Sequence, residues 1–398
     1  MKSLLPKLVG LEQAAFVVGR NIADNTLAAQ EVVHSMTTNR TSMLIMTLKL
    51  DMEKAYDRVS WEARALTRKP TLPVPVHPSI SEPISLINER VDRGQLTSYR
   101  EGEAQLIHLL YADNLLITVQ ATESNALSIQ ELLADYTKLT NQKVNLEKSQ
   151  LLLLWWIDKE RKKMLYNCLG IQMATMPFTY LGVLISDRRV RVQEHQALVD
   201  RVGRKLARWK RGAIEKKARS ILWESGAGRG LHLQNWNTVT SSKAEGGLAI
   251  RKLKETRAAL LGKLVFKVLN RQESPWVKLL RAKFGELNPW IPSVPARASW
   301  VWRALVNTTV TIRGGCRKQI GNGRTTKAAS EPWLSALPWN RQPRQMHPRL
   351  LNEEMLISDL IAESRGQADR LVEEAGFDLA FQISTTELTE AVGPDRWI

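Results

Sequence analysis

The stretch Met43-Leu44-Ile45-Met46-Thr47-Leu48-Lys49-Leu50-Asp51 is almost entirely apolar and ends in a carboxylate. Such a run is typical of a buried strand, and its last residue presents an acidic side chain where the strand emerges. The segment therefore predicts a sheet with Asp51 at one end.

A second carboxylate follows in a similar setting. Two apolar runs between Leu106 and Val119 flank Tyr111-Ala112-Asp113-Asn114, and turn-forming residues between strand-like runs predict a β-hairpin with a polar tip. If the two strands are neighbours, Asp51 and Asp113 meet and can hold the divalent ions that nucleotidyl transfer needs. The same residues also fit a solvated strand end and an ordinary hairpin turn.

Helices and boundaries complete the pattern. Apolar residues recur at helical spacing between Ser124 and Leu139, and a second apolar stripe lies among Lys and Arg residues between Leu198 and Lys210. Prolines between Lys69 and Pro83 predict a loop or join, because proline lacks an amide donor and disfavours helix at the residue before it. Residues Asn322 to Arg349 are expected to form a linker.

Charge points to the class of partner. The 398 residues have a net charge of +17 and a pI near 9.9, which favours a polyanionic partner such as nucleic acid. Residues 351–398 carry −8, and the window from Arg188 to Arg219 carries +9. Two cysteines exclude a disulfide framework. We expect an intracellular protein with no signal peptide and no transmembrane segment.

One known family shares these features. Leu48-Lys49-Leu50-Asp51-Met52-Glu53-Lys54-Ala55-Tyr56-Asp57 resembles the first palm motif of reverse transcriptases from plant LINE-type (non-LTR) retrotransposons. Further segments resemble other motifs of that family, in the same order: Gln13 to Arg20 in the fingers, His108 to Asn114 in the hairpin, Gln142 to Ser149 and Tyr180 to Val183 in the palm, and Glu245 to Leu248, Ile320 to Gly323 and Asp395 to Trp397 beyond it.

The resemblance implies a role for each matching residue. Asp51, Asp113 and Asn114 would form the catalytic set, with Asp51 and Asp113 binding Mg²⁺ or Mn²⁺. Tyr56 would lie under the sugar of the incoming nucleotide, Arg20 near its triphosphate and Lys148 near the leaving pyrophosphate. Tyr56 also fits a half-buried strand aromatic, and the two cations fit an ordinary surface.

The basic window falls where the family places its thumb. Its cations would contact the nucleic-acid backbone without reading its sequence, although a solvated amphipathic helix is the alternative. The candidate contacts are Arg201, Arg204, Lys205, Arg208, Lys210 and Arg211.

The sequence also departs from the family. Asn114 replaces an aspartate, so the site loses a negative charge and should bind metal more weakly. The palm helix and Gln-Gly motif expected near residues 62–84 are missing, and a further stretch is missing near Gly212. These departures predict a truncated, degenerate copy with impaired or no activity.

The predicted fold is α+β: a reverse-transcriptase-like palm of antiparallel sheet and helices, a finger remnant, a helical basic thumb-like region and an acidic helical tail. The expected boundaries are 1–45 for the finger remnant, 46–186 for the palm, 187–223 for the thumb-like region, 224–350 for a retrotransposon-type connection region and 351–398 for the tail.

Three functions fit this fold. The first is an RNA-directed DNA polymerase that uses an RNA template, a DNA primer and deoxynucleoside triphosphates, expected in the nucleus by resemblance. The second is a non-enzymatic remnant that binds nucleic acid, and the third is an interaction protein with an acidic partner.

Overall fold

The computed structural model describes residues 10, 12–15, 17–38, 44–53, 78–140, 142–211, 235–289, 292–327, 331, 333, 356–359 and 393–398. The chain divides into two compact units: unit 1 comprises Met1–Thr256 and Glu273–Lys283, and unit 2 comprises Arg257–Gln272 and Phe284–Ile398. The described residues form helices and small, mainly antiparallel sheets, which confirms the α+β class.

The largest sheet lies in unit 1 and has the strand order β4-β5-β1-β7-β8, with β6 also paired to β1. The predicted strand is β1 (Ile45–Glu53), and the predicted hairpin is β4 (His108–Tyr111) with β5 (Asn114–Gln120). β1 pairs with β5 over seven residues and with β7 (Gln150–Leu152) on its other side. The remaining strands are β6 (Lys143–Val144) and β8 (Gln172–Met173).

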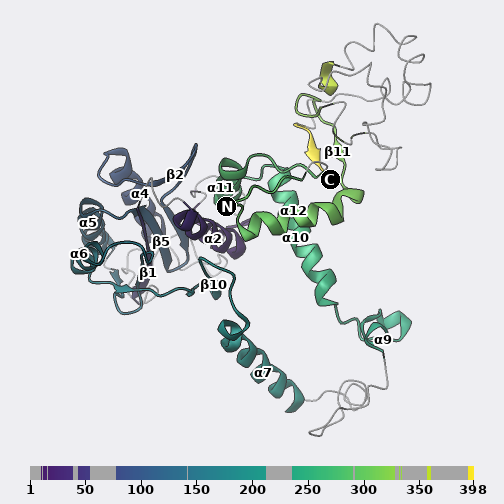
Figure 1. Ribbon diagram of the computed structural model, residues 1–398, viewed down its shortest axis with the longest axis horizontal. Helices are drawn as coiled ribbons and strands as arrows, with labels where there is room; N and C mark the ends of the chain where they lie inside the picture. Colours follow the sequence, from purple (N-terminus) through teal and green to yellow (C-terminus); the bar gives the residue numbers. More distant parts are fainter. Residues whose placement is uncertain are drawn as a thin grey trace. The chain divides into compact units, whose positions relative to one another are not determined.

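Three helices cover one face of this sheet (Figure 1): α4 (Pro78–Asp92), α5 (Glu123–Thr140) and α6 (Lys159–Leu169). Alternate residues of β1 face them, because Met46, Leu48 and Leu50 are fully buried in the same apolar cluster as Ile129 of α5 and Leu165 of α6. α5 extends the helix predicted from Ser124 to Leu139 by one residue at each end.

The opposite face of the sheet carries polar side chains and meets α2 (Ile22–Thr38). Thr47 of β1 contacts the sulfur of Met36 on α2 at 3.5 Å and the hydroxyl of Thr118 on β5 at 3.4 Å. Since side chains alternate along a strand, Asp51 projects from this same face.

The prediction of a loop from Lys69 to Pro83 is wrong at its end, where α4 begins at Pro78 and contains Pro83. Proline is well suited to the first helical position. Pro83 loses one helical hydrogen bond, but Ile84 and Ile87 on the next turn are buried in the core, and that burial offsets the loss.

Other elements of unit 1 follow the sheet. β2 (Tyr99–Glu101) pairs with β3 (Ala104–Leu106), and β9 (Phe178–Tyr180) with β10 (Val183–Ile185). The second hairpin has a two-residue turn in which Leu181 and Gly182 both have positive φ, as a type I′ turn requires. Unit 1 also contains the helices η1 (Val192–His195), α7 (Gln196–Arg211), α9 (Trp236–Thr240), η2 (Lys243–Glu245) and α11 (Pro275–Phe284). The last residue of α11 falls in unit 2.

Unit 2 contains most of α10 (Leu253–Leu269), α12 (Trp300–Ile312), η3 (Arg313–Gly315) and the pair β11 (Lys318–Gln319) and β12 (Arg396–Trp397). The linker predicted from Asn322 is irregular in its first residues, and most of the rest lies outside the described residues. Residues 321–326 form a loop whose amides and hydroxyls bind the Asp395 carboxylate: Oδ1 accepts from the amides of Gly321 (2.8 Å) and Gly323 (2.9 Å), and Oδ2 from the hydroxyls of Thr325 (3.0 Å) and Thr326 (2.8 Å).

Candidate catalytic end of the sheet

The two predicted carboxylates lie at the same end of the same sheet. In the register between β1 and β5, Asp51 is directly opposite Asn114, and the amide of Met52 donates to the carbonyl of Asp113 at 3.3 Å. Directly opposite residues of an antiparallel pair have Cβ atoms about 5 Å apart on one face. The strands are therefore neighbours, as the pairing of these acids requires.

The hairpin that carries Asp113 makes a tight turn. Tyr111 pairs with Asn114, so Ala112 and Asp113 are the two turn residues, and Ala112 has a φ of +55°. A positive φ is unfavourable for any residue with a Cβ atom, so this turn stores backbone strain. The side-chain amide of Asn114 donates to Oδ1 of Asp113 at 2.9 Å. The tip is thus held in one geometry beside β1.

A second loop fixes the end of β1 from the other side. The amide of Asp51 donates to the hydroxyl of Ser149 at 3.2 Å, and the amide of Asn145 donates to the carbonyl of Asp51 at 2.8 Å. The amide of Lys148 donates to Oδ1 of Asn145 at 3.1 Å, and the Lys148 side chain is exposed. The structure therefore brings the turn that contains Lys148 to the backbone of Asp51.

The oxygen donors at this end suit a hard divalent cation. Asp51 and Asp113 offer carboxylate oxygens and Asn114 an amide oxygen, and all three side chains are half-buried. Within the described part of the chain, no group of three or more His, Cys, Asp or Glu residues could hold a metal ion. The pair of acids with one amide is the set that this end of the sheet provides.

The Arg20 side chain hydrogen-bonds to the backbone of the preceding residues. Its guanidinium donates to the carbonyl of Gln13 at 2.6 Å and to the carbonyl of Gly10. Burial lowers the pKa of Arg20, and the negative charge of Glu12 opposes that effect. The segment it supports lies along β4, since Gln13 forms a parallel bridge with Leu110. Tyr56 lies outside the described residues.

Buried polar residues of α2 connect this region to distant parts of unit 1. Asn25 is fully buried, and its side-chain amide donates to the carbonyl of Leu110 at 3.1 Å. Leu110 lies two positions before the turn residue Ala112. Gln30 binds the backbone of Ser186 beyond β10 with both ends of its amide, at 2.7 and 3.3 Å. The sequence analysis predicted neither α2 nor these residues; polar residues among the apolar ones between Ile22 and Thr38 were the available signal.

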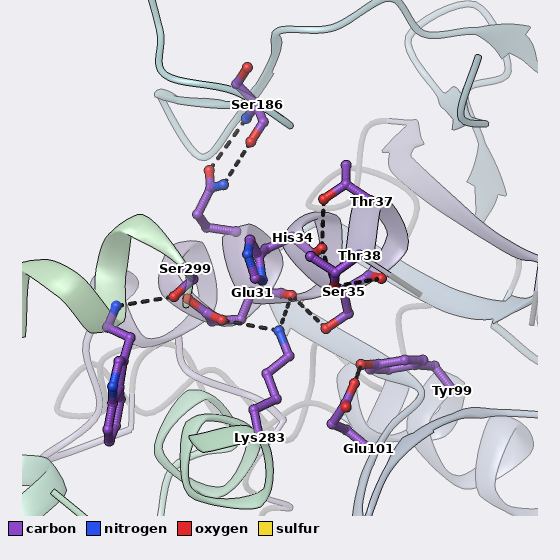
Figure 2. A network of polar contacts seen from close by, with 12 residues as sticks. Glu31, His34, Ser35, Thr37, Thr38, Tyr99, Glu101, Ser186, Lys283 and Ser299 are labelled. Carbon is purple, nitrogen blue, oxygen red and sulfur yellow. Dashed lines mark hydrogen bonds and ion pairs between the residues drawn. The ribbon is translucent and has the colours of Figure 1, made fainter. Parts of the chain in front are cut away.

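Two acidic residues of α2 bind α11. Asp24 accepts from the indole nitrogen of Trp276 at 2.7 Å, and Glu31 forms an ion pair with Lys283 at 3.1 Å (Figure 2). Asp24 and Glu31 are seven residues apart on α2, and their partners are seven residues apart on α11, so the two contacts lie along one face of each helix. Glu31 is completely buried and Lys283 is 5% exposed. Burial lowers the pKa of Lys283, and the negative charge of Glu31 opposes that effect.

The predicted basic helix is α7. Arg201 and Arg204 are exposed on it, and so are Leu198, Val199 and Val202, each about half exposed. The side chains of Lys205, Arg208, Lys210 and Arg211 lie outside the described part of this helix. α7 therefore combines exposed cations with exposed aliphatic side chains in unit 1.

Comparison with known proteins gives partial matches. The chain is 29% identical over 131 residues to the Arabidopsis thaliana "Putative ribonuclease H protein At1g65750", covering 31% of this chain and 21% of that protein. It is 29% identical over 101 residues to the "Uncharacterized mitochondrial protein AtMg00310" of the same plant, covering 25% of this chain and 66% of that protein. The chain thus spans about a fifth of one relative and just under two thirds of the other. No model of a known protein family matches the chain.

No helix among the described residues combines the length and the apolar character that crossing a membrane requires.

Proposed function

We propose that this chain derives from the RNA-directed DNA polymerase of a plant LINE-type retrotransposon and is a degenerate copy of it, acting in the nucleus by the same resemblance. The observation that carries the proposal is the register that places Asp51 opposite Asn114, next to Asp113, on the face of an antiparallel sheet opposite its three covering helices. One relative's name refers to a ribonuclease H protein, which supports a nucleic-acid context.

The residues at this end of the sheet would have different roles, set by the chemistry of their side chains. Asp51 and Asp113 would hold Mg²⁺ or Mn²⁺, which supplies charge neutralisation for phosphoryl oxygens when it is bound. Asn114 fixes Asp113 through its 2.9 Å hydrogen bond but adds no negative charge. Lys148 stands on the turn bound to Asp51 and can meet a phosphate there, while the exposed cations of α7 can contact the backbone of an RNA template and DNA primer.

The second candidate is a protein that binds nucleic acid without chemistry. Asn114 favours it, because the site has two carboxylates where the family has three. Both candidates share the exposed cations of α7, and they differ in whether deoxynucleoside triphosphates are consumed.

Primer extension on poly(rA)/oligo(dT) with Mg²⁺ or Mn²⁺ separates the two candidates. Incorporation that disappears in Asp51→Ala establishes a polymerase at this site. Template binding without incorporation establishes the binding protein. A folded chain that neither incorporates nucleotides nor binds the template would rule out both candidates. Binding to an acidic protein instead would favour the third function, an interaction protein. Glu131→Ala, which changes an exposed acid on α5, is the matched control.

A further inference from the structure

Trp155 presents its indole ring to solvent in the loop between β7 and α6. The ring is 68% exposed, although tryptophan is ordinarily well buried. Its neighbour Trp156 packs against the core, and the two rings meet edge to face with centroids 5.4 Å apart and planes at 85°. Trp155 is therefore held at the surface by a ring that is itself anchored.

The helix that follows carries its cations at the unfavourable end. Lys159, Arg161, Lys162 and Lys163 lie in the first five residues of α6, where the helix dipole disfavours positive charge. Lys159 and Lys163 are also a like-charge pair one turn apart. With Asp158 and Glu160 included, this short segment retains a net charge of +2. These repulsions are relieved when an anion binds.

Among the exposed side chains of α6, which also include Glu160 and Asn167, two lysines and a tyrosine form a stripe, and Trp155 precedes it in the chain. Lys159, Lys163 and Tyr166 are exposed and fall four and three residues apart, on one face of the helix. Tyr166 is 39% exposed. The ammonium group of Lys162 donates to the carbonyl of Trp155 at 3.1 Å, which ties the Trp155 loop to the start of α6.

This stripe is remote from the candidate catalytic end. β7 runs antiparallel to β1, with Gln150 opposite Lys49 and Leu152 opposite Thr47, so the chain reaches Trp155 by moving away from Asp51. Trp155 lies three positions beyond the end of β7 at Leu152. α6 packs on the face opposite Asp51, beside α5 (Figure 1). A ligand on α6 therefore lies on the other face of the sheet from Asp51.

We infer that Trp155, Lys159, Lys163 and Tyr166 form an accessory binding surface for single-stranded nucleic acid. Bases stack on exposed aromatic rings whatever their sequence, and lysines between the rings match the phosphates that join successive bases. A duplex hides the faces of its bases, so it gains only the charge contribution. The inference rests on the proposed function in taking nucleic acid as the partner.

The test measures binding of the full chain to fluorescein-labelled (dT)₂₀ and to a 20-base-pair duplex by anisotropy. Trp155→Ala is expected to weaken single-strand binding about tenfold and to change duplex binding by less than twofold. Lys159→Ser with Lys163→Ser is expected to lower the salt slope for the single strand by about 1.4. This double variant removes unfavourable charges from α6, so its melting temperature should not fall.

Matched controls are available elsewhere in the chain. Trp300→Ala removes a tryptophan that is 55% exposed at the start of α12, and Lys254→Ser with Lys278→Ser removes two exposed lysines of other helices. Both should bind (dT)₂₀ like the wild type.

The outcomes separate this inference from the proposed function. If the wild type binds no nucleic acid, the proposed function fails. If it binds and Trp155→Ala behaves like Trp300→Ala, the accessory surface is overturned while the proposed function stands. If poly-glutamate binds to the wild type as tightly as (dT)₂₀ and Trp155→Ala weakens both equally, the surface recognises acidic chains in general and the inference is overturned.

Discussion

At the scale of single residues, Asn114 keeps the backbone geometry of the candidate site but supplies no negative charge. Its main chain occupies the register position opposite Asp51, and its side chain orients Asp113. An aspartate in this position would keep the register and add a negative charge where a metal is expected. The amide is therefore expected to lower metal affinity without disturbing the sheet that surrounds it.

Asn114→Asp is accordingly expected to raise nucleotide incorporation with Mg²⁺ by at least about tenfold, because a third carboxylate strengthens metal binding. Primer extension measures the change, and Asn114→Asp combined with Asp51→Ala should return to background. Equal activity of Asn114→Asp and wild type would show that charge at this position does not limit the reaction.

His108 predicts a pH dependence of stability. It is 2% exposed at the start of β4, and both ring nitrogens lack a hydrogen-bond partner among the described residues. Burial lowers the pKa of His108 to about 4, against 6.5 for the free side chain, and the charge of Glu12 offsets part of that effect. Above pH 6.5 both folded and unfolded states are neutral. As the pH falls from 6.5 towards 4, the unfolded chain takes up a proton that the folded chain does not, so stability is lost.

At pH 5 the expected loss relative to pH 7 is about 2 kcal/mol from His108. His108→Leu should remove this component of the difference between urea unfolding at the two pH values. His195→Leu, a change at a half-exposed histidine, is the control and should keep the wild-type difference. An unchanged pH difference in His108→Leu would contradict the assignment.

At the scale of elements, α2 and α11 are joined by buried polar pairs, which makes their packing sensitive to charge. Lys283→Met leaves the Glu31 carboxylate buried without its cation, and this is expected to cost about 3 to 5 kcal/mol of unfolding free energy. Adding Glu31→Gln should recover much of the loss, since no uncompensated charge remains. Urea unfolding gives both values, and Lys278→Met on the exposed side of α11 should stay within about 0.5 kcal/mol of wild type.

In unit 2, the loop of residues 321–326 is bound by a charged side chain, that of Asp395, which precedes β12. Burial opposes ionisation of Asp395, but its bonds to Gly321, Gly323, Thr325 and Thr326 outweigh burial and hold its pKa below the usual value. Asp395→Asn is expected to cost about 1 to 2 kcal/mol at pH 7.

The pH dependence of this cost follows from the lowered pKa. The contribution of the charge is complete above about pH 4 and is lost as the pH falls through the lower folded pKa. The stability difference between wild type and Asp395→Asn should therefore narrow below pH 4 in chemical denaturation. Asp359→Asn, at an acid that accepts a 3.3 Å bond, is the control.

Elements with local signals could be predicted from the sequence, whereas those fixed by distant contacts could not. β1, the β4–β5 hairpin and α5 follow from apolar periodicity and turn residues within twenty positions of each other. The role of Asp24 depends on Trp276, which is 252 residues away, and that of residues 321–326 on Asp395 about 70 residues later. α4 forms at two prolines because the core buries its isoleucines, which local preference does not show.

At the scale of the whole molecule, the net charge of +17 makes any binding of nucleic acid depend on salt. Arg201→Gln with Arg204→Gln is expected to lower the logarithmic salt slope for (dT)₂₀ by about 1.4 and to weaken binding equally for all sequences. Arg251→Gln with Arg257→Gln, at exposed positions near α10, is the control. Titration between about 50 and 200 mM salt measures the slopes.

The course of the chain between the two units has a consequence for how shortened copies behave. The chain leaves unit 1 after Thr256, returns for residues 273–283 and leaves again, so no single cut divides the protein along its units. A gene copy that stops anywhere between these positions encodes the whole sheet and yet lacks α11. It would be left with Asp24 and Glu31 facing no partner from α11. The products of partial duplicates ending there should be unstable and be degraded, whereas those reaching past residue 283 should persist.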